Sequence, residues 1–120
     1  MRKKRFDANG IYEKMVQLMR DRQLFLRPDL TRDDLAREVM TNRTYVTRTL
    51  RMKGLSFPQF VNSFRAAYAI EQMASGRYSD ASPEEIAILS GFSSDDTMNR
   101  YIKKSAGLTA CALKDRMAGE

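Results

Sequence analysis

The sequence has no histidine, no tryptophan and only one cysteine, Cys111. Without histidine the chain cannot form a histidine-ligated metal site, a Ser-His-Asp triad or a Cys-His dyad. A single cysteine excludes an internal disulfide and a multi-cysteine zinc site. No run approaches the roughly 20 consecutive apolar residues of a membrane span. The basic start Arg2–Arg5 is not followed by the apolar segment of a signal peptide. These absences leave carboxylates, lysines and backbone groups as the only means of catalysis.

Acidic residues are absent between Val39 and Ile70. The chain has 120 residues and a net charge of +6, but four of those charges belong to Arg2–Arg5, which leaves +2 for the rest. A solvated surface normally mixes charges of both signs, so an acid-free stretch of this length indicates a surface that faces a polyanion. An ordinary basic face is the alternative. The cations of the stretch are Arg43, Arg48, Arg51, Lys53 and Arg65.

Apolar residues recur at helical spacing along the chain, and no alternating strand pattern is present. Residues that favour the start or the end of a helix divide this apolar pattern into separate helices. Thr31 with Asp34 resembles a capping box, and Thr41 and Asn42 are both N-cap candidates. Ser82 followed by Pro83 is a strong helix start, and Gly54 ends a helix. The prediction is all-α with about seven helices. The first four cover about residues 9–24, 31–39, 43–52 and 57–74. The fifth starts at Ser82 and is broken at Gly91, the sixth starts at Ser93 or Ser94 and ends at Gly107, and the last runs from about 109 to 117.

The two halves of the chain repeat each other. Leu35-Ala36 matches Ile86-Ala87, the apolar pair Val46/Leu50 matches Met98/Ile102, and Gly54 matches Gly107. The offset grows from 51 to 52 to 53 residues, which corresponds to single-residue differences in turns. Each half therefore predicts a short helix, a tight turn, a second helix and a capped third helix.

This order of helices is typical of a helix-turn-helix, in which two helices cross steeply at a small residue. Ala36 and Ala87 supply that residue. The turn favours a residue that tolerates positive φ, and Gly91 does so. Met40 stands at the equivalent position in the first half, where it requires either backbone strain or another turn geometry.

The second helix of each unit has a polar outer face. In the first unit, Arg48 can bond guanine O6 and N7, while Thr44 and Thr47 can contact thymine methyl groups or phosphates. Phosphate contact is expected for Arg51 and Lys53, near the end of that helix. The outer face of the first unit is Arg43, Thr44, Thr47, Arg48 and Arg51.

The second unit has an outer face of mixed charge, so we expect it to bind DNA more weakly. Asp95 and Asp96 can accept hydrogen bonds from cytosine N4, but stabilisation of a helix N-terminus is the simpler interpretation. The outer face of this unit is Asp95, Asp96, Thr97, Asn99, Arg100, Lys103 and Lys104.

The segments Thr31–Ala36 and Asn42–Arg48 resemble the first helix-turn-helix of AraC/XylS-type transcription regulators. Residues 86–87 and 91–94, Arg100 and residues 103–109 resemble that family's second unit. The Asn42–Tyr45 run and residues 60–65 also resemble the regulators of Bacteroides-type bacteria. The resemblance implies two helix-turn-helix subdomains joined by a long central helix. It places base contacts at Thr44, Thr47 and Arg48 in the first unit and at Asp95, Asp96, Thr97 and Arg100 in the second. Ser94, Lys103 and Lys104 are further expected DNA-binding residues.

The resemblance implies a bacterial, cytoplasmic transcription regulator, not an enzyme, that binds double-stranded promoter DNA without a cofactor. RNA polymerase and a sensing domain outside these residues are further implied partners. The chain is then either a stand-alone regulator or the C-terminal part of a larger one. The expected organisation is a basic tail (1–8), a first subdomain (9–56), a linking helix (57–75) and a second subdomain (76–120).

The long central helix is expected to hold the two recognition helices about one duplex turn apart, in successive major-groove segments. A helical protein-interaction module that has lost DNA binding is the alternative function. Met40 and the acidic start of the second recognition helix favour that alternative.

Overall fold

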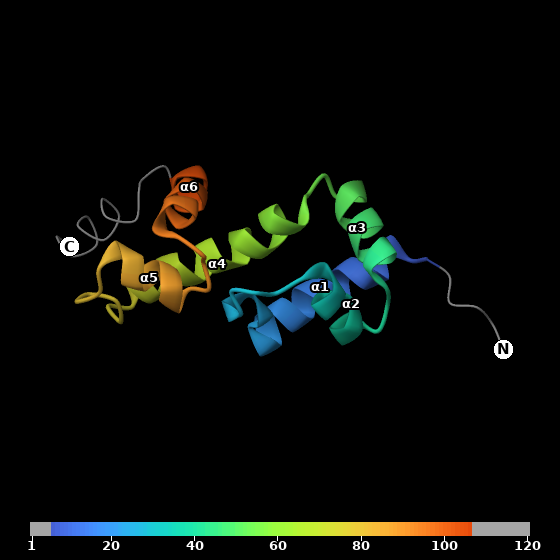
Figure 1. The fold of residues 1–120 in the computed structure, drawn as a ribbon, viewed down its shortest axis with the longest axis horizontal. Coiled ribbons are helices and arrows are strands. Elements are labelled where there is room, and N and C mark those ends of the chain that lie inside the picture. The colour runs from blue at the N-terminus through green and yellow to red at the C-terminus, as the bar shows by residue number, and fades with distance from the viewer. Residues whose placement is uncertain (1–5, 107–120) are drawn as a thin grey trace. The chain divides into compact units, whose positions relative to one another are not determined.

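The computed structural model describes residues 6–106, and this part of the chain is all-α (Figure 1). The seventh predicted helix, residues 109–117, lies outside the described residues, as do Gly107 and Cys111. The described elements are α1 (Ala8–Arg22), the 3-10 turn η1 (Leu24–Leu26), α2 (Arg32–Val39), α3 (Arg43–Met52), α4 (Phe57–Ala74), α5 (Pro83–Leu89) and α6 (Asp95–Ala106).

The chain forms two compact units. Within the described residues, the first unit comprises residues 6–24 and 29–60, and the second comprises residues 25–28 and 61–106. The short segment 25–28 therefore packs with residues that come much later in the sequence. Helix α4 begins in the first unit and continues in the second.

Helix α1 begins at Asp7, whose side chain accepts a hydrogen bond from the backbone N–H of Gly10. It buries Met15 and Met19 and packs against α2 and α3. The helix predicted for residues 9–24 ends earlier, at Arg22, because Gln23 adopts a left-handed conformation with φ 49°. That conformation turns the chain into η1.

Helices α2 and α3 begin at capping residues that the sequence indicated. Thr31 and Asp34 form the predicted capping box, with their side chains and backbone N–H groups bonded reciprocally. Asn42 caps α3 by accepting from the N–H of Tyr45 at 2.9 Å. The predicted bounds of α3, residues 43–52, are confirmed, and Val46 and Leu50 are buried as expected.

Helix α4 has the predicted bounds, residues 57–74. Its start is fixed by Ser56 and Gln59, because the Ser56 hydroxyl accepts from the Gln59 N–H and the Gln59 side chain accepts from the Ser56 N–H. The helix ends two residues before Gly76, which has φ 82° in the turn that follows.

The second unit is built around α5 and α6. Ser82 caps α5 by accepting from the Glu85 N–H, with Pro83 at the first helical position as predicted. Ser94 caps α6 by accepting from the Thr97 N–H at 3.2 Å. The core of this unit contains Ala66, Ala69, Met73, Tyr78, Ile86, Ala87, Phe92, Met98 and Ile102.

Arg65 is a buried residue, not a surface cation. Only 8% of it is exposed, and burial lowers the pKa of its guanidinium. Its Nε donates to the Phe25 carbonyl at 2.6 Å, and its Nη2 donates to the Arg27 carbonyl at 2.7 Å. Its Nη1 donates to Asn62 Oδ1 at 2.8 Å. Arg65 therefore holds residues 25–28 against α4, and the prediction that it faces a polyanion is wrong.

Candidate nucleic-acid interface

The repeat seen in the sequence is reproduced in the hydrogen bonds of the two turns. The Thr41 N–H donates to the Ala36 carbonyl at 2.9 Å, and the Phe92 N–H donates to the Ala87 carbonyl at the same distance. Both alanines are buried, as a close approach of two helices requires. Each unit therefore contains one turn of the same construction, between α2 and α3 and between α5 and α6.

The residue at the centre of each turn has a left-handed backbone. Gly91 has φ 89° and Met40 has φ 64°, so Met40 adopts the strained conformation instead of another turn geometry. The two sites differ in their surroundings. A Cβ at Gly91 would lie 2.4 Å from the Phe25 carbonyl oxygen, whereas Met40 is 69% exposed. Glycine is thus required sterically in the second turn alone.

Helix α3 turns one side to the core and the other to solvent. Val46 and Leu50 are buried, so helical spacing places Thr44, Arg48 and Arg51 on the opposite side. All three are exposed. No acidic residue lies on α3, so every charge on its outer face is positive.

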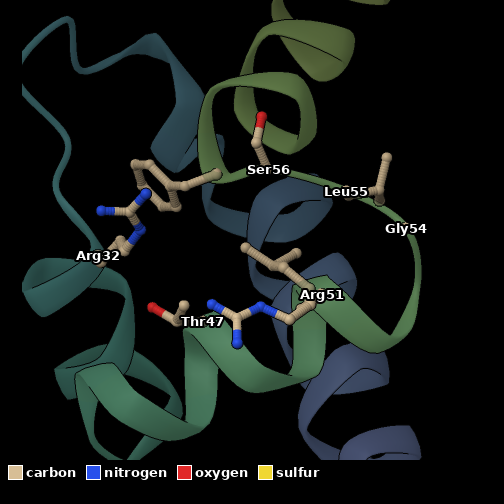
Figure 2. A pocket seen from close by; sticks show the side chains of 8 residues that line it. Arg32, Thr47, Arg51, Gly54, Leu55 and Ser56 are labelled. Atoms are coloured by element: carbon tan, nitrogen blue, oxygen red, sulfur yellow. The ribbon is translucent and has the colours of Figure 1, made fainter.

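Arg43 and Thr47 lie on one flank of this face, where α3 borders two hollows that are also lined by Arg32 and Phe57. The hollow that Thr47 lines is a pocket of about 370 Å³, which Figure 2 shows. In Figure 2 the side chains of Arg32 and Arg51 reach into this pocket from two sides, with Thr47 beside Arg51. Two guanidinium groups at an open hollow suit a phosphate group.

Arg32 is a candidate contact that the sequence did not reveal. It lies at the first position of α2, and its Cζ lies 5.5 Å from the centroid of the Phe57 ring. Asp33 and Asp34 follow it directly and obscure its charge in the sequence. The signal that could have found it is its place at a helix start, beside the recognition helix.

The opposite flank of α3 is aromatic. The Cζ of Arg48 lies 4.4 Å from the centroid of the Phe6 ring. The Phe6 ring packs in turn on Tyr45, with a centroid distance of 4.9 Å. Arg48, which is predicted to contact guanine, is therefore contacted on one side by Phe6, a residue that precedes α1.

Lys53, the C-cap of α3, has partners within the protein. Its Nζ donates to Asn9 Oδ1 at 3.0 Å and lies 5.1 Å from the centroid of the Tyr12 ring. Both partners belong to α1. The predicted phosphate contact by Lys53 must compete with these interactions, whereas Arg51 points into the open pocket.

Helix α6 repeats the arrangement of α3 at an offset of 52 residues. Met98 and Ile102 are buried, so helical spacing places Asp96, Arg100 and Lys103 on the outer side. These positions correspond to Thr44, Arg48 and Arg51. Lys104 is also exposed, in the last turn.

The start of α6 is partly turned away from solvent. Asp95 is half-buried and Asp96 is exposed, and both lie in the first turn, where the helix dipole stabilises negative charge. The Ser94 hydroxyl also donates to Thr97 Oγ1 at 3.0 Å. Ser94 and Thr97 are therefore engaged in capping, while Asp96 faces outward together with Arg100.

Within residues 6–106, no cluster of three His, Cys, Asp or Glu side chains could hold a metal ion. In the same range no helix is long and apolar enough to cross a membrane.

A family model described as a helix-turn-helix domain matches residues 35–116, which include both turns. The chain belongs to the AraC-type helix-turn-helix family. Members of this family are DNA-binding domains of transcription regulators and not enzymes.

Two relatives are similar to this chain in sequence. The TCP pilus virulence regulatory proteins of two Vibrio cholerae strains are 33% identical over 84 residues. That match covers 67% of this AraC-type chain and 29% of each relative, so this chain spans under a third of their length.

The solved structures share the fold. A DNA-binding transcriptional dual regulator from Escherichia coli K-12 superposes with a TM-score of 0.71 at 15% identity, covering 98% of this chain and all of that one. The C-terminal domain of AraT, a response regulator from Geobacillus stearothermophilus, gives 0.68 at 19% identity. It covers 94% of this chain and 88% of that domain.

Proposed function

We propose that this chain binds promoter DNA sequence-specifically by inserting α3 and α6 into successive major-groove segments. The observation that supports this most directly is the repeated turn with an arginine at the same outward position of each following helix. Arg48 and Arg100 lie opposite the buried pairs Val46/Leu50 and Met98/Ile102. An outward arginine in the middle of a recognition helix can form two hydrogen bonds with guanine.

In the first unit we assign base contact to Thr44, Thr47 and Arg48. Phosphate contact falls to the cations that line the two hollows beside the recognition helix. Contacts with phosphates position the helix, while contacts with base edges specify sequence. The phosphate-contacting set is Arg32, Arg43 and Arg51, with a smaller share for Lys53.

In the second unit Arg100 is the proposed base contact, with Lys103 and Lys104 on phosphates. The capping role of Ser94 and Thr97 leaves them fewer groups for DNA. Asp96 faces outward beside Arg100 and repels phosphates, so this unit contributes less to affinity than the first. Asp95 and Asp96 serve mainly to stabilise the start of α6.

We further propose that the protein belongs to the Bacteroides-type subgroup of the family, which the Asn42–Tyr45 run favours. We also propose that it acts on chromosomal promoters in the cytoplasm, near RNA polymerase. The greater length of the Vibrio cholerae relatives favours a sensing domain outside the present residues.

The decisive test selects bound duplexes from a randomised pool with the 120-residue chain and measures stoichiometry on the minimal site. Because α3 and α6 differ in sequence, we expect one chain on an asymmetric site of about two helical turns. Inserting about five base pairs between the half-sites should abolish simultaneous contact, because it places them on opposite faces of the duplex.

A two-chain complex on a symmetric site would contradict the tandem arrangement. A chain that selects no sequence and gives no salt-resistant complex would instead be the protein-interaction module. Arg48→Ala should cost about 1–3 kcal/mol on the selected site and much less on random duplex.

A further inference from the structure

The aromatic flank of α3 contains the rings of Phe6 and Tyr45, and neither ring is among the proposed DNA contacts. Phe6 precedes Asp7, the residue that caps α1. Its backbone position is therefore tied to a helix that packs directly on α3. Its ring is half-buried, with Tyr45 on one side and the Arg48 guanidinium on another.

We propose that Phe6 is a positioning residue for Arg48: its ring, supported by Tyr45, holds the guanidinium ready for base contact. This inference rests on the proposed base contact by Arg48. A free arginine on a helix surface samples many rotamers, and binding must remove that freedom. An aromatic ring 4.4 Å from Cζ restricts the side chain before DNA arrives. A guanidinium carries five N–H donors, so contact with one ring leaves donors for a base edge.

The other outward arginine of the first unit provides a contrast. Arg51 borders the pocket of Figure 2, where the nearby ring of Phe57 is occupied by Arg32 instead. Among the described contacts, no aromatic ring supports the guanidinium of Arg51. A phosphate tolerates several orientations of a guanidinium, so Arg51 is suited to a phosphate. Arg48 has an aromatic platform, the Phe6 ring, and is suited to a base edge, which requires one orientation.

The test is a double-mutant cycle with Phe6→Leu and Arg48→Ala, using the duplex selected by the wild-type chain and a shuffled duplex of equal length. In the wild-type background Phe6→Leu should weaken binding to the selected duplex about two- to fivefold. It should leave the shuffled duplex unchanged. In the Arg48→Ala background Phe6→Leu should have no effect on either duplex. Phe6→Tyr keeps the ring and should restore wild-type affinity.

A second measurement follows the contact in the free protein. The side-chain protons of Arg48 should show an upfield ring-current shift in NMR spectra, which Phe6→Leu removes and Phe6→Tyr retains. Circular dichroism of each variant shows whether the helices are intact. Phe57→Leu is the matched control, because it removes the ring beside Arg32 and should not move the Arg48 resonances.

The outcomes separate this inference from the proposed function. If Arg48→Ala does not alter sequence preference, the base contact itself is wrong. If Arg48→Ala does alter it but Phe6→Leu changes nothing, positioning by Phe6 is overturned and base contact stands. Equal loss on both duplexes, or a loss that persists without Arg48, would also overturn the inference.

Discussion

Met40 and Gly91 occupy the same position in the two helix-turn-helix units, and both have a left-handed backbone, with φ 64° and 89°. Each donates its N–H at 3.1 Å to the carbonyl three residues earlier, Arg37 or Ile88. The first unit thus keeps the turn of the second without the residue that best suits it.

Met40→Gly should stabilise the chain by about 1 kcal/mol, because glycine adopts this backbone without the strain of a Cβ. The side chain of Met40 is 69% exposed, so little packing is lost. Urea denaturation measures the change in the free energy of unfolding. Met40→Ala is the matched control, since it removes the thioether but keeps the Cβ, and it should change stability by less than about 0.5 kcal/mol. A Met40→Gly variant no more stable than Met40→Ala would show that the turn is unstrained.

Gly91→Ala should destabilise the chain by about 2–5 kcal/mol, combining left-handed strain with overpacking. The added Cβ would lie 2.4 Å from the Phe25 carbonyl oxygen and 2.9 Å from the Leu26 Cα, and both atoms belong to backbone that cannot move alone. Gly76→Ala is the control, because a Cβ there meets nothing within 4 Å and only the strain of φ 82° remains. Equal losses for the two variants, measured by thermal denaturation, would exclude the steric term.

Arg65→Met should cost about 2–4 kcal/mol, because the carbonyls of Phe25 and Arg27 lose a charged donor while they remain partly shielded from water. Methionine retains much of the buried volume, so the change reports the hydrogen bonds. Arg77→Met, at an exposed site of the same unit, should leave stability almost unchanged. If both variants unfold at the same urea concentration as wild type, Arg65 does not hold the 25–28 segment.

The fold could be predicted from local chemistry, whereas parts of the site could not. Thr31, Asn42 and Ser82 determine helix starts within three residues, so the sequence revealed them. The role of Arg65 depends on carbonyls about 40 residues away, and no pattern near position 65 reports such contacts. Likewise, the platform of Arg48 comes from Phe6, in a segment that the charge pattern marked only as a basic tail.

Arg51→Gln should reduce the slope of log binding constant against log salt concentration by about one unit, as expected for the loss of one phosphate contact. Arg32→Gln should do the same if the pocket between these residues holds a phosphate. Lys53→Gln should change the slope less, because Lys53 Nζ is bonded to Asn9 in the free protein. Titrations of the selected duplex at several salt concentrations give the slopes. Arg20→Gln on α1 removes an exposed cation outside the interface, and a slope change as large as that of Arg51→Gln would make the effect non-specific.

Asp95→Asn and Asp96→Asn distinguish helix stabilisation from base contact in the second unit. Both carboxylates lie in the first turn of α6, where each stabilises the helix by about 0.3–1 kcal/mol through its interaction with the helix dipole. If that is their role, each variant should be slightly less stable and should select the same sequence as wild type. Loss of the exposed Asp96 charge should also strengthen binding to random duplex, because it removes repulsion from phosphates. Loss of the half-buried Asp95 charge should strengthen this binding less. Selection from a randomised site tests the preference, and titration of a shuffled duplex tests the repulsion. A preference that changes at one base pair would show that the carboxylate accepts a hydrogen bond from cytosine N4.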